Sequence, residues 1–296
     1  MKDSRSPLPP LDAWVYTAGI LAVCCMLAVP RLDPGEVEFD SPFADYNRPR
    51  VAALRDSEAA ARVVMLGNSQ LKYAVDDGRL AFTADAGGEA EVLRIVGNNA
   101  QIRDFGALLP EILDAKPDLL LIQAPLMLKQ RSSSMLLRGL QAYARWRLFS
   151  PDAPFDPYDI DQQALQFDLP CSNDFSLGPL NLRKSRLEEG SAYSHDSDNA
   201  LAGLIFVREA ADAGIPVVLF SLPYHPTLAA EFDQSDYDEL LAEYAQRAEV
   251  DTWMPAAATA LDAEAFCDFV HVNERGRAET SAWLRGRIAN YLNGSG

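Results

Sequence analysis

The chain has 296 residues, 48% of them hydrophobic and 23% charged, and a formal net charge of -17. This composition is typical of a folded globular protein and excludes a disordered chain, a collagen-like repeat and a polytopic membrane protein. The acidic excess argues against nucleic acid as a partner. The three histidines and four cysteines form neither C-x-x-C nor H-E-x-x-H, so we expect no metal site.

An uncharged apolar run occupies residues 13–29, between Asp12 and Arg31. As a helix it would be about 26 Å long, close to the thickness of a hydrocarbon layer of about 30 Å. A cleaved signal peptide usually has a shorter apolar region followed by a small-x-small site, and no Ala-x-Ala follows here. We predict an uncleaved N-terminal transmembrane helix within residues 1–30, with a cleaved signal and a buried core helix as the alternatives.

The charges that flank this run favour a cytoplasmic N-terminus. Lys2 and Arg5 precede the run, and acidic residues after it count little in the positive-inside rule. The remaining chain would then lie outside the cytoplasmic membrane, in the periplasm or another extracytoplasmic space. Two cysteines would be in the bilayer, which leaves Cys171 and Cys267 as the pair that can form a disulfide.

The body of the chain alternates short apolar runs with helical patterns. Residues 31–60 predict a linker with a lead-in helix at about 50–61, and residues 61–296 predict one α/β domain. Runs rich in β-branched residues predict buried strands, and stretches between them have helical spacing. The strands are expected at 62–66, 91–96, 118–122, 215–222 and, more weakly, 250–254, and the helices at 70–83, 101–115, 197–213 and 273–292.

This order of elements implies a parallel sheet with helices on both faces. Such sheets bind ligands at the carboxyl ends of their strands. A segment at about 128–196 is too long for a plain crossover between the third and fourth strands, so we interpret it as an insertion.

The turn after the first predicted strand offers a nucleophile. Gly67, Asn68 and Ser69 lead from this strand into a helix. A serine at the start of a helix lies where backbone N–H groups and the helix dipole favour a developing anion. The alternative is that Ser69 is an ordinary N-cap.

A base and its partner lie near the other end of the chain. Asp268 and His271 occur in a D-x-x-H-x-N-x-x-G pattern before the last predicted helix. A serine needs a base to take its proton, and the base needs a partner to fix its tautomer. We therefore expect Ser69 Oγ within about 3–4 Å of a His271 ring nitrogen, with Asp268 on the far side of the ring. His225 and His195 are the rival bases.

At these residues the chain resembles the SGNH (GDSL-like) hydrolase family. The resemblance implies a flavodoxin-like three-layer α/β/α fold with a central parallel sheet of about five strands. It also implies that Ser69, His271 and Asp268 are nucleophile, base and orienting partner, without a cofactor.

The same resemblance implies an oxyanion hole. Its donors would be the backbone N–H groups of Ser69 and Gly97, although Gly97 is also typical of a plain strand-to-helix turn. The third family block departs from the pattern, because the chain has Gln123, followed by Ala and Pro, where Gly-x-Asn is expected. The side chains of Asn98, Asn99 or Gln123 would then have to help.

The N-terminal span and the large insertion resemble a subgroup of envelope proteins, related to alginate O-acetylation proteins and the D-alanyl transfer protein of teichoic acid. This implies a membrane-anchored serine esterase or O-acyltransferase acting on acyl esters of a cell-envelope or exported polysaccharide. A membrane-bound acyltransferase is the implied partner. The alternative is a catalytically silent envelope scaffold with the same fold.

The insertion contains a basic, apolar segment whose role can be tested. Residues 119–151 contain no acidic residue, and Arg138, Arg145 and Arg147 lie among apolar residues at helical spacing. Such a helix can bind a membrane surface or a partner, or it can pack its apolar side on the sheet.

If the segment binds membranes, protein without the predicted anchor should float with anionic liposomes at low salt, where attraction is least screened. Replacing Arg138, Arg145 and Arg147 by Gln should weaken this binding. Absence of flotation at low salt would assign the segment to ordinary packing.

Overall fold

The computed structural model describes residues 42–75, 78–81, 88–97, 100–129, 193–231, 234–255 and 261–294. Within these ranges no helix is long and apolar enough to cross a membrane. The span predicted at residues 13–29 and most of the predicted insertion lie outside the described residues, so both stay predictions. The described part begins with helix α2.

A mixed sheet forms the centre of the described domain. Its strand order is β2-β3-β1-β4-β5-β6. Strand β2 is antiparallel to β3, and all other neighbours are parallel. The five parallel strands thus have the order 2-1-3-4-5 found in flavodoxin-like folds, as expected. The strands are β1 (Ala61–Gly67), β2 (Gly78–Ala81), β3 (Glu89–Val96), β4 (Leu119–Gln123), β5 (Val217–Phe220) and β6 (Asp251–Trp253).

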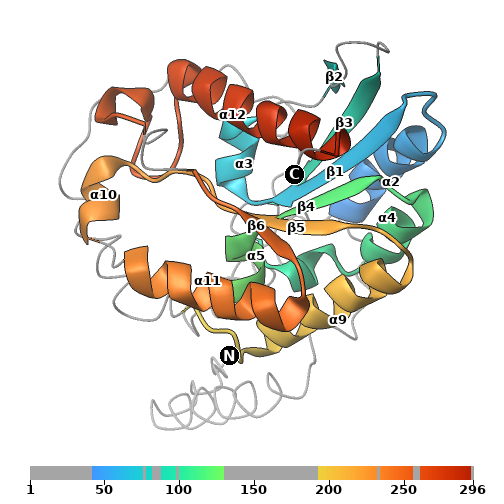
Figure 1. Cartoon of the computed structure of the whole chain (residues 1–296), viewed down its shortest axis with the longest axis horizontal. Coiled ribbons are helices and arrows are strands. Elements are labelled where there is room, and N and C mark those ends of the chain that lie inside the picture. The colour runs from blue at the N-terminus through green and yellow to red at the C-terminus, as the bar shows by residue number, and fades with distance from the viewer. Residues whose placement is uncertain are drawn as a thin grey trace, which may run out of the picture. The chain divides into compact units, whose positions relative to one another are not determined.

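Helices cover both faces of this sheet, which gives three layers (Figure 1). Helices α3 and α12 pack on one face, and α2, α4, α5, α9 and α11 pack on the other. The helices are α2 (Pro42–Arg55), α3 (Ser69–Ala74), α4 (Leu109–Ala115), α5 (Ala124–Leu128), α9 (Asp198–Asp212), α10 (Pro226–Glu231), α11 (Gln234–Ala248) and α12 (Glu274–Leu292), with short 3-10 turns η2 (Ile102–Phe105) and η4 (Ala263–Ala265).

Strand β1 shows why the sheet needs two helical layers. Val64 and Leu66 belong to the core under α2, α4 and α9, whereas Val63 and Met65 belong to the core under α3 and α12. All four are fully buried. Successive side chains of a strand point to opposite faces, so a continuous apolar run requires cover on both.

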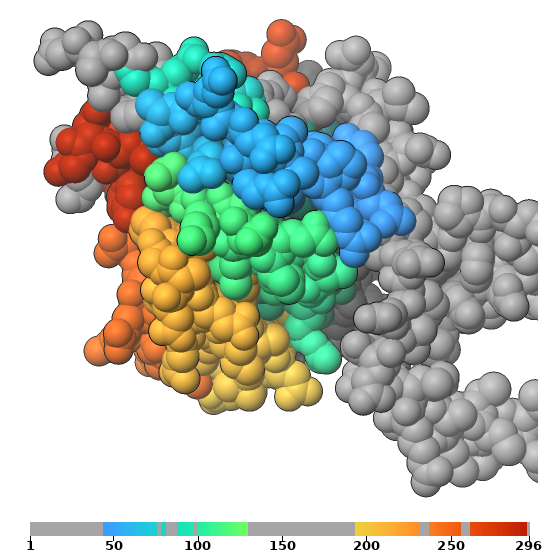
Figure 2. Space-filling model, turned by 90° about the vertical axis from the view of Figure 1, so that its right-hand side faces the viewer, coloured from blue at the N-terminus to red at the C-terminus, as the bar shows by residue number. Residues whose placement is uncertain are grey.

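The end of the molecule opposite the carboxyl ends of the strands is seen in Figure 2. The blue, green and yellow segments lie side by side there, in the order in which the sheet arranges β1, β4 and β5. The turns after β1, β4 and β5 lie at the other end of the sheet, where the sequence predicts the site.

Some predicted elements were wrong in their bounds. The helix expected at 70–83 ends at Ala74, because Val75 is already extended, and Gly78–Ala81 forms the antiparallel edge strand instead. The helix expected at 101–115 is divided into η2 and α4. Pro110 lies in the first turn of α4; proline is tolerated there but not inside a continuous helix.

The lead-in helix was also misplaced, and two helices were missed. Helix α2 spans Pro42–Arg55 rather than 50–61, since the chain must leave the helix before β1 begins at Ala61. Helices α10 and α11, which precede β6, were not predicted. All five expected strands and the helices at 197–213 and 273–292 agree with the structure within about two residues.

Two helical glycines give opposite predictions for the same substitution. A Cβ at Gly203 in α9 would lie 2.5 Å from Tyr244 Oη and 2.6 Å from Met127 Sδ, whereas a Cβ at Gly286 in α12 would meet nothing within 4 Å. Tyr244 Oη cannot easily move, because it donates to Ala200 O at 2.9 Å.

Gly203→Ala should therefore destabilise the protein by about 1–2 kcal/mol, since crowding outweighs the gain of about 1 kcal/mol in helix propensity. Gly286→Ala should stabilise it by about 0.5–1 kcal/mol. Urea unfolding of both variants measures the two effects, and equal shifts would contradict the packing described for α9.

Candidate active site

Ser69 is the first residue of α3, directly after the carboxyl end of β1. Asn68 caps this helix, because its side-chain oxygen accepts the backbone N–H two residues on, at 2.9 Å. Gly67 has no room for a side chain: a Cβ there would lie 2.4 Å from Leu71 Cδ2 and 2.9 Å from Gln123 Oε1. The glycine therefore lets α3 begin directly against the sheet, with Ser69 at its edge.

His271 links this serine to a carboxylate. Its Nε2 lies 2.9 Å from Ser69 Oγ, and its Nδ1 lies 2.8 Å from Asp268 Oδ2 on the far side of the ring. The distance expected from the sequence is thus met, while the catalytic role of the three residues stays a prediction. With the carboxylate on Nδ1–H, Nε2 is the nitrogen that can accept the hydroxyl proton of Ser69.

Asp268 is held in its ionised form. Its Oδ1 accepts the N–H groups of Val270 at 2.8 Å and of His271 at 2.9 Å. Burial acts to raise the pKa of Asp268, but the hydrogen bond and charge of His271, together with these two N–H donors, hold the pKa well below its ordinary value. A carboxylate that stays charged can stabilise the imidazolium that forms when His271 takes a proton.

The loop that carries both residues is closed at its base by the main chain. Cys267 N donates to His271 O at 2.8 Å, and Asn273 N donates to Ala265 O at 2.9 Å. Asn273 also caps α12, since its Oδ1 accepts the N–H of Gly276 at 3.1 Å. A Cβ at Gly276 would lie 2.2 Å from Ala265 O, so the Asn and Gly of the sequence pattern start α12 directly against the loop.

Tyr73 is a site residue that the sequence analysis missed. Its ring lies 4.7 Å from the His271 ring, centroid to centroid, at a tilt of 44°. Its carbonyl oxygen accepts from Arg277 Nε at 2.9 Å, which joins α3 to α12. The spacing of four residues between Ser69 and Tyr73 is a signal, because residues one helical turn apart share a face. Tyr73 thus packs against the imidazole of His271.

The predicted oxyanion hole needs correction at Gly97. Its N–H donates to Gly67 O at 3.1 Å, because β1 and β3 pair in parallel with Gly67 opposite Val96. Gly97 is therefore the end of a strand and does not offer a free donor. Ser69, as the first residue of α3, has an N–H without an acceptor in its own helix. Asn98 and Asn99 lie outside the described residues.

Gln123, which stands where the family motif has Gly-x-Asn, does not offer its side chain to an oxyanion either. Gln123 is fully buried. Its Oε1 accepts the N–H of Asn68 at 2.9 Å, and its Nε2 donates to Gln70 Oε1 at 2.8 Å. The expectation that Gln123 helps to bind an oxyanion is therefore wrong, because both ends of its amide bind the turn around Ser69.

His225, the first rival base, lies behind the loop that carries Asp268 and His271, where its backbone N–H donates to Phe269 O at 3.1 Å. It is only 6% exposed, and its ring packs edge-on against Phe266 and Phe269. Its Nδ1 accepts the N–H of Thr227 at 3.1 Å. Burial lowers the pKa of His225, against the opposing effect of the Asp268 charge. These contacts make His225 a support of the loop rather than the partner of Ser69.

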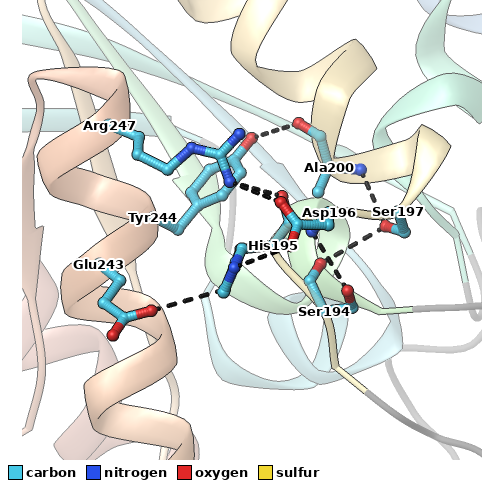
Figure 3. A network of polar contacts seen from close by, with 8 residues as sticks. All are labelled: Ser194, His195, Asp196, Ser197, Ala200, Glu243, Tyr244 and Arg247. Carbon is cyan, nitrogen blue, oxygen red and sulfur yellow. Dashed lines mark hydrogen bonds and ion pairs between the residues drawn. The ribbon is translucent and has the colours of Figure 1, made fainter.

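His195, the second rival, belongs to a surface network between the segment that enters α9 and helix α11 (Figure 3). Its Nε2 lies 3.0 Å from Asp196 Oδ2, and its Nδ1 lies 3.6 Å from Glu243 Oε2. Arg247 donates to His195 O and to Asp196, both at 3.0 Å. This histidine joins the segment before α9 to α11 and is not the partner of Ser69.

No group of three or more His, Cys, Asp or Glu side chains in the described ranges could hold a metal ion. Cys267 is disulfide-bonded. The other three cysteines lie outside the described residues, so its pairing with Cys171 stays a prediction.

Comparisons with protein-family models and with curated proteins give no match. Among solved structures, the chain is similar to an acetylxylan esterase from Geobacillus stearothermophilus, at 14% identity and a TM-score of 0.42, over 77% of this chain and 94% of the other. It is also similar to a GDSL-like lipase from Bacteroides thetaiotaomicron, at 14% identity and a TM-score of 0.38, over 84% and 99%. Similarity at this level assigns neither family nor substrate, so the chemistry must come from the site itself.

Asp268→Asn tests the charge of the loop. The amide would favour the wrong tautomer of His271. If the three residues form a catalytic triad, kcat on an activated ester should fall by about 10³–10⁴-fold.

The same variant has a second, independent measure in the pH dependence of unfolding. Because folding lowers the pKa of Asp268, its contribution to stability is present above its unfolded pKa of about 3.9 and is lost as the pH falls below it. The wild type should be more stable than Asp268→Asn at pH 7, and thermal unfolding should show this difference shrinking below about pH 4. A difference that does not change with pH would contradict the ionised Asp268.

Proposed function

We propose that the protein is a serine-dependent ester hydrolase or O-acyltransferase that works through an acyl-enzyme. The observation that carries this proposal is the continuous chain of hydrogen bonds from Ser69 Oγ through His271 to Asp268. Ser69 also begins a helix at the carboxyl edge of a parallel sheet, where a developing negative charge is favoured.

The proposed reaction has two steps with one proton carrier. Ser69 Oγ attacks the acyl carbonyl carbon while its proton moves to His271 Nε2, and Asp268 stabilises the imidazolium. The N–H of Ser69 binds the oxyanion. The tetrahedral intermediate collapses, and the leaving alkoxide takes the proton from His271. Water or a second hydroxyl then gives its proton to His271 and attacks the acyl-enzyme. As the second tetrahedral intermediate collapses, His271 returns the proton to Ser69 Oγ, which restores the free serine.

The acceptor of the acyl group separates hydrolysis from transfer. Both reactions share the acyl-enzyme and differ only in whether water or a sugar hydroxyl reaches it. The resemblance to SGNH hydrolases, and to envelope proteins within that group, favours ester-linked acyl groups of a polysaccharide. With the predicted span at residues 13–29, it supports a single-pass, extracytoplasmic enzyme beside a membrane-bound acyltransferase.

A catalytically silent scaffold is the second candidate. It is favoured by the oxyanion side of the site, where the N–H of Gly97 is engaged by Gly67 O and Gln123 takes the place of the expected Asn. Loss of one oxyanion donor costs about 3–4 kcal/mol in a comparable site. The two candidates differ in whether Ser69 reacts.

An acyl-enzyme burst distinguishes them. The full chain, purified in detergent, should release the chromophoric alcohol of an activated acetyl ester in a burst with an amplitude near one equivalent, and Ser69→Ala should abolish it. Ser57→Ala is the matched control, because Ser57 precedes β1 at the opposite end of the strand from Ser69. Absence of turnover by the wild type at high enzyme concentration would support the scaffold.

A further inference from the structure

The turn that presents Ser69 is held by a buried amide from a neighbouring strand. Gln123 is the last residue of β4, and β4 pairs with β1 with Leu66 opposite Ile122. The side chain of Gln123 therefore starts beside Gly67. It is 0% exposed, and an amide buried to this extent costs free energy unless its polar atoms find partners.

One backbone N–H fixes the orientation of two side-chain amides. The N–H of Asn68 is a donor, so the atom of Gln123 that faces it at 2.9 Å must be Oε1. Its Nε2 therefore faces Gln70 at 2.8 Å, and the Gln70 atom there must be Oε1. Both residues that flank Ser69 are thus tied to one side chain on β4.

The space for this contact is reserved by the backbone. A Cβ at Gly67 would lie 2.9 Å from Gln123 Oε1, a separation at which one of the two would have to move. The absence of that Cβ lets the amide reach the turn. The hydrogen bond from Asn68 to Gln123 therefore depends on a glycine at position 67.

We propose that Gln123 is a positioning residue for the nucleophile: through Asn68 and Gln70 it holds the main chain of the turn so that Ser69 presents its Oγ to His271. This inference rests on the proposed function. The contact to Asn68 fixes the peptide that precedes Ser69, and the contact to Gln70 fixes the residue that follows it. A shift of about 1 Å in a reacting group can lower the rate about 100-fold. A turn that is fixed by hydrogen bonds should therefore make Ser69 more reactive than a turn that is free to shift.

Labelling of Ser69 by a fluorophosphonate tests this role without a known substrate. Gln123→Met keeps a similar volume but accepts and donates no comparable hydrogen bond. In the full chain, its second-order labelling rate at Ser69, followed by mass spectrometry, should fall by about 10- to 100-fold. A folded Gln123→Met protein that is labelled within about twofold of the wild-type rate, a difference of less than about 0.5 kcal/mol, would overturn the proposal.

Gln123→Glu is the conservative rescue. Its carboxyl group can still accept from Asn68 N–H. When ionised it can also accept from Gln70 Nε2, once the side-chain amide of Gln70 has flipped by 180°. Labelling should therefore recover to within roughly threefold of the wild type, about 0.7 kcal/mol. Equal losses in folded Glu and Met variants would show that the effect does not follow the hydrogen bonds. If Gln123→Met fails to fold, slow labelling of folded Gln123→Glu would overturn the proposal by itself.

Asn199→Leu provides the matched control for the loss of a buried amide. Asn199 is 5% exposed, and its Nδ2 donates to Leu126 O and Met127 O at 2.8 and 2.9 Å, at the end of α5. This variant should lower the unfolding temperature but leave the labelling rate of Ser69 unchanged. Wild-type protein that is not labelled at Ser69 would contradict the proposed function, whereas labelled wild type with an unaffected Gln123→Met would contradict the positioning role alone.

Discussion

The site depends on one hydrogen bond, between Ser69 and His271, that joins residues 202 positions apart in the sequence. Neither residue lies in a long rigid element, so each needs its own support. The turn of Ser69 is held between β1 and β4, and the loop of His271 is closed on the first turn of α12. Helices α3 and α12 then pack on the same face of the sheet, which brings the two supports within reach of each other.

The two supports differ in their chemistry. Amides hold the serine side, through Asn68, Gln70 and Gln123, whereas a carboxylate holds the histidine, through Asp268. Amides do not titrate, so the hydrogen bonds that these three residues make in the serine turn do not depend on their protonation. On the other side of the site, the hydrogen bond and charge of His271 lower the pKa of Asp268 against the effect of burial, whereas burial lowers the pKa of His225 against the charge of Asp268.

The sequence predicted those parts of the structure that depend on local patterns. Apolar runs identified four of the five parallel strands, since strands buried on both faces carry no polar alternation. The fifth, β6, begins with the exposed Asp251 and gave only a weak signal. The short D-x-x-H spacing placed Asp268 beside His271 because a single turn brings these side chains together. The predicted end of the helix after Ser69 was wrong, because the backbone of Val75 is already extended. The apolar pattern did not show this, since Val75 is buried in the same core as Leu71.

Hydrogen-bond partners could not be predicted in this way, because they depend on the register between strands distant in sequence. Gly97 is in the position that a family motif would assign to an oxyanion donor, yet the pairing of Gly67 with Val96 directs its N–H to Gly67 O. In the same manner, the register of β4 against β1 decides that Gln123 meets the backbone of Asn68 rather than a ligand. From the sequence alone, the replacement of the expected Gly-x-Asn by Gln123 and its neighbours therefore indicates only the loss of an oxyanion donor. In the structure, the side chain of Gln123 reaches the turn around Ser69 and binds Asn68 and Gln70 there.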